Sequence, residues 1–338
     1  SGEHKDEAME TMANGLAVVV RRLYDEGKLG GVIGMGGTGG TSIATAAMRV
    51  LPVGVPKVMV STVAGGDVSA YAGTKDITFI PSIVDVAGIN SISRTIFANA
   101  AGAIAGMVKL DAPQTGKERP LVTASMFGNT TTCVERARLV VEKGGYEVLV
   151  FHATGIGGRT MESLITDGYI AGSMDITTTE IADEVCGGVF RSGPERCMAA
   201  SLAGIPAVIV PGCVDMANFG SIDTVPQRYE GRNLYQWNPN VTLLRTNVQE
   251  NIRIGETIAA AVNQATAPVA VLLPMKGVSM LDSKEDRFWD PEADRACFNA
   301  IKSKLRADIP VQELDHNIND SAFADSAANT LLQMMQDV

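Results

Sequence analysis

The stretch Gly31-Val-Ile-Gly-Met-Gly-Gly-Thr-Gly-Gly-Thr-Ser42 decides how this chain begins to fold, because an apolar run breaks into a glycine loop and continues into helix-like sequence. Glycines let the backbone turn sharply, and the N–H groups at the start of the following helix attract an anion. The loop has neither the lysine of a Walker A motif nor a G-x-G-x-x-G spacing followed by an acid that reads a ribose. It predicts a phosphate or nucleotide site, with a tight strand-to-helix turn or a carboxylate site as alternatives.

Two neighbouring segments supply the residues expected at this site. The glycine loop contributes backbone N–H groups and hydroxyls from Gly36, Gly37, Thr38, Gly39, Gly40 and Thr41. The segment Ser61–Tyr71 follows the next apolar run, where ligands of parallel sheets gather. There Ser61 and Thr62 are predicted to bind phosphate, and Asp67 to orient a metal or a ribose. A capped turn with a solvated Asp67 is the alternative.

Short apolar runs alternate with amphipathic stretches from end to end, which indicates βαβ units and a parallel sheet. The predicted strands are Gly31–Met35, Lys57–Ser61, Ile77–Pro81, Leu121–Ser125, Glu147–His152, Ala207–Pro211, Val241–Arg245, Val269–Pro274 and Val311–Asp315. The predicted helices are Ala8–Glu26, Thr41–Val50, Ser91–Val108, Thr131–Lys143, Thr160–Thr166, Pro194–Ala203, Asn247–Ala265 and Pro291–Leu305.

A polar segment rich in proline and charge interrupts this alternation and predicts a boundary between two α/β domains. We expect a nucleotide-binding domain over residues 1–112, a linker over 113–119 and a second domain over 120–338. The first domain has only two clear strands and a weaker third one. We therefore expect that it lacks its amino-terminal strand, or that another subunit completes its sheet.

Composition excludes several classes of protein. The 338 residues are 46% hydrophobic and 20% charged, with a net charge of −10, which argues against a nucleic-acid surface. No apolar run approaches the roughly 20 residues of a membrane span, and the polar opening has no signal-peptide core. We therefore expect a cytoplasmic protein. The five cysteines are widely spaced among apolar or small residues, and we interpret them as reduced, buried thiols.

The stretch Phe151–Glu162 repeats the opening design, with a strand, a glycine turn and a helix start. It places His152 at the strand end and Gly157, Gly158 and Arg159 in the turn, where they are expected to hold an anionic substrate. His316 follows the last predicted strand. Since strand ends of a parallel sheet converge on one crevice, we expect both histidines to transfer protons or bind a metal there. A structural role for each histidine is the alternative.

Three more strand-end segments supply partners for these histidines. Gly128 and Asn129 lie in a glycine and hydroxyl-rich turn and are expected to bind substrate. Glu180 and Asp215 are candidate catalytic carboxylates, which together with histidine suit either acid–base work or a divalent metal of unknown identity. For Glu180 the alternative is an acidic helix start. Aromatics and arginines concentrate in Gln227–Pro239, which suggests a lid or a subunit contact.

These segments in combination resemble the UPF0261 family, the Tm-1-like ATP-binding domain proteins that include the tomato mosaic virus resistance protein of plants. The resemblance rests on Gly31–Thr41, Val60–Asp67, Asp76–Thr78, Ala98–Gly106, Phe127–Thr132, Phe151–Glu162, Leu273–Asp282 and Glu313–Asp320. It implies two Rossmann-like domains, ATP with Mg²⁺ at the first glycine loop, and homodimers. Family members normally open with a strand and a Thr-Leu-Asp-Thr-Lys-Gly-like loop, which does not occur in this sequence.

Three functions remain open at this point. The first is an ATP-binding protein of uncharacterised metabolic role. The second is an enzyme, a hydrolase or lyase, that acts on a small carboxylate or phosphorylated metabolite in the C-terminal domain or the interdomain crevice. The third is an interaction scaffold that uses ATP only for stability.

Overall fold

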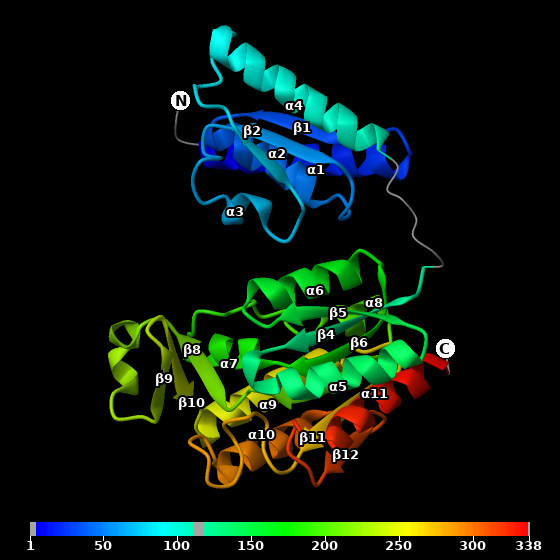
Figure 1. Ribbon diagram of the computed structural model, residues 1–338, viewed down its shortest axis with the longest axis vertical. Coiled ribbons are helices and arrows are strands. Elements are labelled where there is room, and N and C mark those ends of the chain that lie inside the picture. The colour runs from blue at the N-terminus through cyan, green and yellow to red at the C-terminus, as the bar shows by residue number, and fades with distance from the viewer. Residues whose placement is uncertain (1–4, 111–117, 337–338) are drawn as a thin grey trace. The chain divides into compact units, whose positions relative to one another are not determined.

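Strands and helices alternate along the chain, as the sequence predicts, and they form two separate α/β units (Figure 1). The computed structural model describes residues 5–110 and 118–336. The N-terminal unit is Ser1–Lys117 and the C-terminal unit is Glu118–Val338. The predicted linker at 113–119 lies outside the described residues, apart from Glu118 and Arg119.

The N-terminal unit is a three-stranded parallel sheet in the order β1-β2-β3, with helices on both faces. Its elements are α1 (Lys5–Asp25), β1 (Val32–Gly36), α2 (Thr38–Arg49), β2 (Lys57–Ser61), α3 (Ser69–Ala72), β3 (Thr78–Pro81) and α4 (Ser91–Lys109). Val58 and Val60 of the central strand pack with Ala100 of α4. Met59 points to the other face, beside α2, because successive side chains of a strand alternate between faces.

The C-terminal unit is built on a six-stranded parallel sheet in the order β12-β11-β7-β6-β4-β5. Its strands are β4 (Leu121–Met126), β5 (Glu147–His152), β6 (Ile170–Thr177), β7 (Ala207–Gly212), β11 (Val269–Pro274) and β12 (Val311–Leu314). Its helices are η1 (Gly128–Thr130), α5 (Thr131–Lys143), α6 (Ile156–Thr166), α7 (Thr179–Cys186), α8 (Ala199–Ala203), α9 (Val248–Val262), α10 (Pro291–Lys304) and α11 (Ser321–Gln336).

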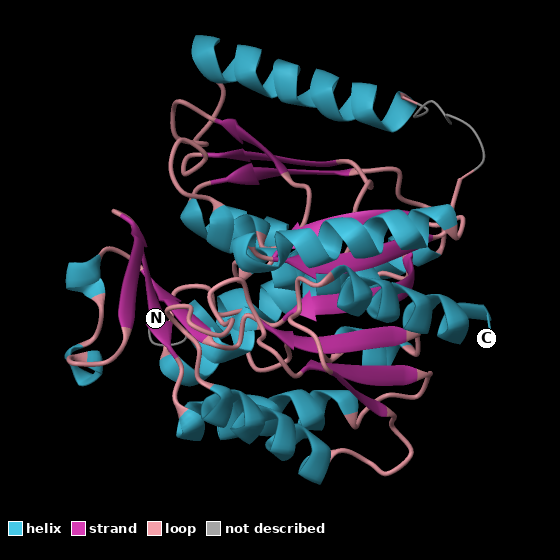
Figure 2. Ribbon diagram, turned by 60° about the horizontal axis from the view of Figure 1, so that its bottom comes forward, coloured by secondary structure: helices cyan, strands magenta, loops and turns pink. Residues whose placement is uncertain are grey.

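Helices cover both faces of this sheet (Figure 2). Ala207 and Ile209 of β7 pack into the cluster formed with α7, α9 and α10, while Val208 and Val210 pack into the cluster formed with α5 and α11. Continuous apolar strands such as β7 follow from this burial on two sides. The fold class predicted from the sequence, α/β with parallel sheets flanked by helices, is therefore confirmed.

A small antiparallel sheet in the order β8-β10-β9 extends from the C-terminal unit. It comprises β8 (Met216–Phe219), β9 (Leu234–Asn238) and β10 (Val241–Arg245), with the short helices η2 (Ile222–Thr224) and η3 (Gln227–Tyr229) in the connection. The prediction that Val241–Arg245 belongs to the parallel sheet is wrong, because this strand pairs with β8 and β9 in the opposite direction. The aromatic segment Gln227–Pro239 forms part of this sheet.

Strand β6 was not predicted from the sequence, although it lies in the middle of the parallel sheet. Its polar side chains are paired inside the protein: Thr123 donates to Ser173 (2.9 Å), and Ser125 donates to Asp175 (2.6 Å). These buried hydrogen bonds let a strand with three polar side chains lie where an apolar run is expected.

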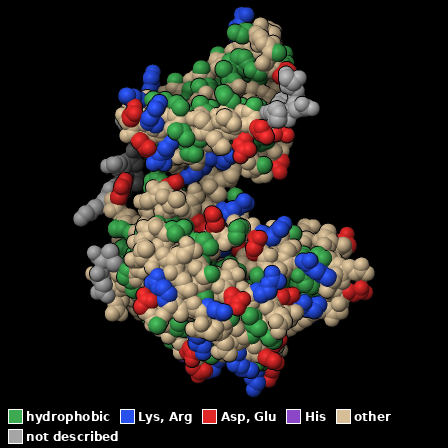
Figure 3. All heavy atoms as spheres, turned by 180° about the vertical axis from the view of Figure 1, so that it is seen from behind, with side chains coloured by type: hydrophobic (Ala, Val, Ile, Leu, Met, Phe, Trp, Pro, Cys, Tyr) green, Lys and Arg blue, Asp and Glu red, His purple; other side chains and the backbone are tan. Residues whose placement is uncertain are grey.

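Charges of both signs are mixed on one face of the C-terminal unit. On the face shown in Figure 3, basic and acidic side chains are interspersed over the C-terminal unit. Within 5–110 and 118–336, no helix combines the length and the apolar composition that a membrane span requires. The five cysteines are buried and unpaired, as predicted.

Candidate functional site

The carboxyl ends of β1, β2 and β3 meet at a hollow of about 610 Å³, which we call the α2 hollow. It is lined by Gly37, Thr38, Thr62, Gly65, Pro81, Ile83, Val84 and Asp85. Three of the predicted nucleotide-binding residues, Gly37, Thr38 and Thr62, are in this lining. The position agrees with the rule that ligands of open parallel sheets bind outside the carboxyl ends of the strands.

The amino end of α2 presents unused donors at this hollow. Gly37 caps the helix in an extended conformation and provides no side-chain acceptor. Among the described residues, the backbone N–H groups of Thr38, Gly39 and Gly40 have no hydrogen-bond acceptor, as expected for a first helical turn. A Cβ on Gly36 would lie 2.9 Å from the Gly40 Cα, so a side chain there would push the loop open. The glycines therefore keep this turn tight and its N–H groups uncovered.

Ile83 stands on the rim of the α2 hollow in a strained conformation. Its φ is +62°, and the Val84 N–H donates to the Ser82 carbonyl (2.7 Å) around it. Such a turn is rare and costly for a β-branched residue. The Ile83 side chain is nonetheless 74% exposed. Strain that holds an apolar side chain in solvent beside a hollow is typical of a functional site.

The structure places three other predicted residues away from the hollow. Thr41 and Ser61 are fully buried, and their hydroxyls share a hydrogen bond of 2.6 Å. Both hydroxyls therefore join α2 to β2 and do not face a ligand. Asp67 is exposed and accepts a hydrogen bond from the Ser69 N–H (2.9 Å), which lowers the pKa of its carboxyl. This arrangement is the capped turn that the sequence left open as the alternative for Asp67.

The second glycine turn, before α6, already holds an anion of the protein itself. The Gly155 and Gly158 N–H groups donate to Glu180 Oε1 (2.6 and 3.1 Å). The other carboxylate oxygen of Glu180 accepts from the Arg196 guanidinium (2.5 Å), and both side chains are buried. Glu180 was predicted as a candidate catalytic carboxylate, but both its oxygens are hydrogen-bonded inside the fold and it lines neither cavity.

Gly157 and Gly158 are required by close packing. A Cβ on Gly157 would lie 1.8 Å from the His152 carbonyl oxygen, and one on Gly158 would lie 2.1 Å from Glu180 Oε2. These two glycines therefore let α6 approach β5 and Glu180. Arg159 is exposed in the first turn of α6, and within the described part of the chain its guanidinium pairs with no carboxylate.

The two candidate histidines lie far apart. His152 ends β5 and His316 follows β12, and these strands form opposite edges of the six-stranded sheet. Five strand spacings separate them, roughly 24 Å, since neighbouring strands lie about 4.8 Å apart. His316 Nδ1 instead lies 3.6 Å from Asp320 Oδ2. The expectation that both histidines share one crevice is wrong, because the chain order does not reveal which strands become the edges.

Asp215 is fully buried and accepts a hydrogen bond from the Ser279 hydroxyl (2.7 Å). Burial raises the pKa of its carboxyl to about 6, against the opposing effect of Arg245. It lines neither the α2 hollow nor the cavity at the carboxyl ends of β4 and β5. Throughout 5–110 and 118–336, no three histidine, cysteine or acidic side chains gather where they could hold a metal ion.

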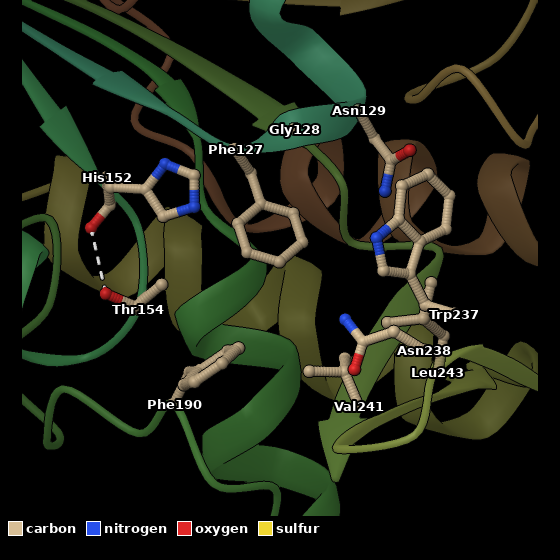
Figure 4. A pocket seen from close by; sticks show the side chains of 10 residues that line it. All are labelled: Phe127, Gly128, Asn129, His152, Thr154, Phe190, Trp237, Asn238, Val241 and Leu243. Atoms are coloured by element: carbon tan, nitrogen blue, oxygen red, sulfur yellow. Dashed lines mark hydrogen bonds between the residues drawn. The ribbon is translucent and has the colours of Figure 1, made fainter. Parts of the chain in front are cut away.

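That second cavity, which we call the β4–β5 pocket, does contain several predicted residues (Figure 4). Its volume is about 310 Å³, and it is lined by Phe127, Gly128, Asn129, His152, Thr154, Phe190, Trp237, Asn238, Val241 and Leu243. Thus His152, Gly128 and Asn129 line one cavity, and their roles in catalysis and substrate binding stay predictions. The aromatic wall was not predicted from the sequence; the aromatic-rich segment Gln227–Pro239, interpreted as a lid or a subunit contact, was the signal for Trp237.

Comparison with known proteins shows similarity over nearly the whole chain. Models of the uncharacterised protein family UPF0261 match it in two parts, the N-terminal domain over residues 1–113 and the C-terminal domain over 119–335. A UPF0261 protein of Clostridium tetani is 52% identical over 330 residues, which are 97% of this chain and 82% of that protein. One from Rhizobium meliloti is 45% identical over 331 residues, 97% of this chain and 81% of its own.

A plant protein is similar over the same length. The ToMV resistance protein Tm-1(GCR237) of Solanum lycopersicum is 42% identical over 335 residues, which are 97% of this chain and 44% of the tomato protein. The chain therefore spans less than half of this relative and about four fifths of the two bacterial ones.

Proposed function

This chain belongs to the uncharacterised protein family UPF0261, and we propose that its N-terminal unit binds a nucleotide such as ATP by the phosphates, together with Mg²⁺. The observation that carries the proposal is the amino end of α2, where the N–H groups of Thr38, Gly39 and Gly40 are without acceptors in the described chain, beside a hollow of about 610 Å³. Such a helix start binds phosphate through oriented N–H groups and the helix dipole.

The remaining lining residues match the other parts of the ligand. The hydroxyls of Thr38 and Thr62 are donors for phosphate oxygens, and the exposed carboxylate of Asp85 is an oxygen ligand for Mg²⁺. The exposed Ile83 side chain offers an apolar surface for a base or ribose. No lysine or arginine is in the described lining, so the metal ion must supply the positive charge. Binding should therefore depend strongly on Mg²⁺.

Calorimetric titration with ATP tests the proposal. A substitution at Gly37 can block phosphate binding without disturbing the fold. Its φ of −79° suits any residue, and a Cβ there meets nothing closer than Thr62 Oγ1 at 3.6 Å. In Gly37→Asp the new carboxylate caps α2 and repels phosphate, so the fold should be as stable as before or more so. Affinity should fall by about 100-fold or more, since hydrogen bonds to charged groups contribute about 1.5–3 kcal/mol each.

Gly37→Ala is the matched control, because it adds the same Cβ without the charge and should retain binding within a few-fold. EDTA should remove most of the heat from the unmutated protein. No binding of Mg-ATP by the unmutated protein would refute the function, and undiminished binding by Gly37→Asp would refute the site.

A further inference from the structure

The β4–β5 pocket lies at the carboxyl ends of β4 and β5, next to the point between β4 and β6 where the strand order of the C-terminal unit reverses. From β4 the chain passes to β5 on one side and then to β6 on the other. Loops at such a switch point diverge and leave a crevice at the carboxyl ends of the strands, which is where α/β proteins bind ligands. The pocket volume of about 310 Å³ is at the lower end of the range for small-molecule sites. Its occupant must therefore be small.

Aromatic rings form much of the wall. Phe127 packs edge to face with Phe190 (6.2 Å between centroids), and Trp237 packs edge to face with Tyr235 (5.9 Å). Figure 4 shows Phe127 and Trp237 on different sides of the cavity. Trp237 is 43% exposed on a hairpin strand, although burial of such a ring would stabilise the fold. Exposed aromatic faces of this kind stack on planar ligands.

Asn129 has a polar side-chain atom without a hydrogen-bond partner in the described structure. The side chain lines the pocket (Figure 4) and is only 3% exposed. Its Oδ1 has no hydrogen-bond partner within the described structure, and its Nδ2 donates only to Met216 Sδ (3.3 Å), a weak acceptor. Leaving a buried acceptor without a partner costs folding free energy. A ligand N–H that bonds to Oδ1 would remove this cost.

The charge of the pocket favours a neutral ligand. None of its lining residues is Lys, Arg, Asp or Glu. His152 is the one titratable side chain in the lining, and its ring packs against Phe127 at 5.3 Å between centroids. The backbone N–H groups of Gly128 and Asn129 have no acceptor among the described residues and are available to a ring carbonyl or ring nitrogen.

From these contacts we propose that the β4–β5 pocket binds a small, uncharged, planar heteroaromatic ring of nucleobase or nicotinamide size. The ring stacks on Trp237 and Phe127, donates an N–H to Asn129 Oδ1, and accepts hydrogen bonds from the N–H groups that begin η1. Amide side chains recognise the donor and acceptor edges of nucleobases in this way. This site belongs to the C-terminal unit, whereas the proposed nucleotide site belongs to the N-terminal unit.

The test uses the full chain with Trp289→Phe, which leaves Trp237 as its one tryptophan. Uracil, adenine and nicotinamide are titrated while tryptophan fluorescence is recorded, and calorimetry repeats each titration. At least one of the three should give saturable quenching. Benzoate tests for a charged ligand, and cyclohexanecarboxamide tests for an amide without an aromatic face; both should bind at least tenfold more weakly.

Three variants test the assigned contacts, and a fourth tests whether the two proposed sites are independent. Asn129→Leu removes the unpartnered acceptor at similar volume, so the melting temperature should hold while affinity falls at least tenfold. Trp237→Leu should lose a similar factor by calorimetry, whereas Trp237→Phe keeps an aromatic face and should stay within a few-fold. Gly37→Asp should leave ring binding unchanged, which separates this site from the α2 hollow.

Three outcomes would overturn the proposal. They are no binding of any of the three rings, equal binding of benzoate or cyclohexanecarboxamide, and unchanged ring affinity in a folded Asn129→Leu protein.

Discussion

Asp215, Asp282 and Asp294 lie around Arg245 in the interior of the C-terminal unit. Arg245 donates to Asp294 (2.7 Å) and lies 3.6 Å from Asp282 Oδ1. Burial, followed by the charges of Asp294 and Asp215, raises the pKa of Asp282 to about 9. One arginine thus faces three carboxyl groups, and Asp282 avoids the excess negative charge by remaining protonated at neutral pH. The acids of this cluster are buried and line neither the α2 hollow nor the β4–β5 pocket.

The Asp282 carboxyl predicts a specific pH dependence of stability. The pKa of this carboxyl is about 9 in the folded state and about 3.9 in an unfolded chain. At a pH between these two values, the carboxyl is therefore protonated in the folded protein and ionised in the unfolded chain. The contribution of the protonated Asp282 carboxyl to the free energy of unfolding is full below about pH 4 and is lost as pH rises towards 9. Asp282→Asn mimics the protonated acid and still accepts from the Val278 N–H. The variant should therefore be more stable than the unmutated protein at pH 8, by about 1–3 kcal/mol.

Urea unfolding at pH 5, 6.5 and 8 measures this effect. The gain from Asp282→Asn should grow with pH, whereas Asp286→Asn, at an exposed position of the same loop, should change neither stability nor its pH slope. A gain that stays constant or shrinks as pH rises would contradict the assignment of the proton to Asp282.

Among the elements, α6 shows how a glycine-rich helix start can be structural. Gly155 caps the helix with a φ of +81°, which favours glycine, and the next two glycines admit the His152 carbonyl and the Glu180 carboxylate. Arg196 joins Glu180 to Asp175 and Glu162 in one buried network. By contrast, α2 begins with three N–H groups that have no acceptor in the described chain. The glycine turn before α6 therefore has N–H groups that are hydrogen-bonded to Glu180. The glycine turn before α2 leaves its N–H groups without an acceptor in the described chain.

Gly157→Ala tests the packing role of α6. The added Cβ would overlap the His152 backbone carbonyl, which cannot rotate away as a side chain could, so α6 must move from β5. We expect a loss of about 3 kcal/mol in the free energy of unfolding. Gly128→Ala, whose Cβ meets nothing within 4 Å, should change it by less than about 0.5 kcal/mol. Equal stability of the two variants in urea would show that α6 does not need this close approach.

At the scale of the molecule, each unit has hydrophobic cores of its own. In the C-terminal unit, two large clusters lie on the two faces of the six-stranded sheet. In the N-terminal unit, Val20, Ala47 and Leu51 form one cluster and Val58, Val60 and Ala100 another. A chain segment with its own buried core on both sides of a sheet can fold independently.

Residues 118–338 expressed alone should therefore fold, with a cooperative thermal transition followed by circular dichroism. The fragment should also retain the near-ultraviolet signal of its tryptophans and the ring affinity of the β4–β5 pocket. A broad transition together with strong binding of a hydrophobic dye would mean that this unit depends on the rest of the chain.

Much of the fold could be predicted because it depends on local patterns. Apolar runs bounded by turn residues located most strands of the parallel sheets, and the glycine loop located the start of α2 and part of its hollow. Strand β6 was not predicted, because the polar residues Ser173, Asp175 and Thr177 are typical of a loop. Their buried hydrogen-bond partners are seen only in the tertiary structure. Val241–Arg245 was placed in the wrong sheet because strand direction is a long-range property.

The sequence by itself determined the α/β class, the alternation of strands and helices, and the turn that opens α2, because periodicity and glycine act over a few residues. Only the tertiary structure decided which of these features share a site. It put His152 and His316 at opposite sheet edges, filled the second glycine turn with Glu180, and placed Trp237 in one pocket lining with Phe127 and Asn129. The physical reason is that strand order and burial, which determine neighbours and free donors, arise from contacts between residues far apart in the chain.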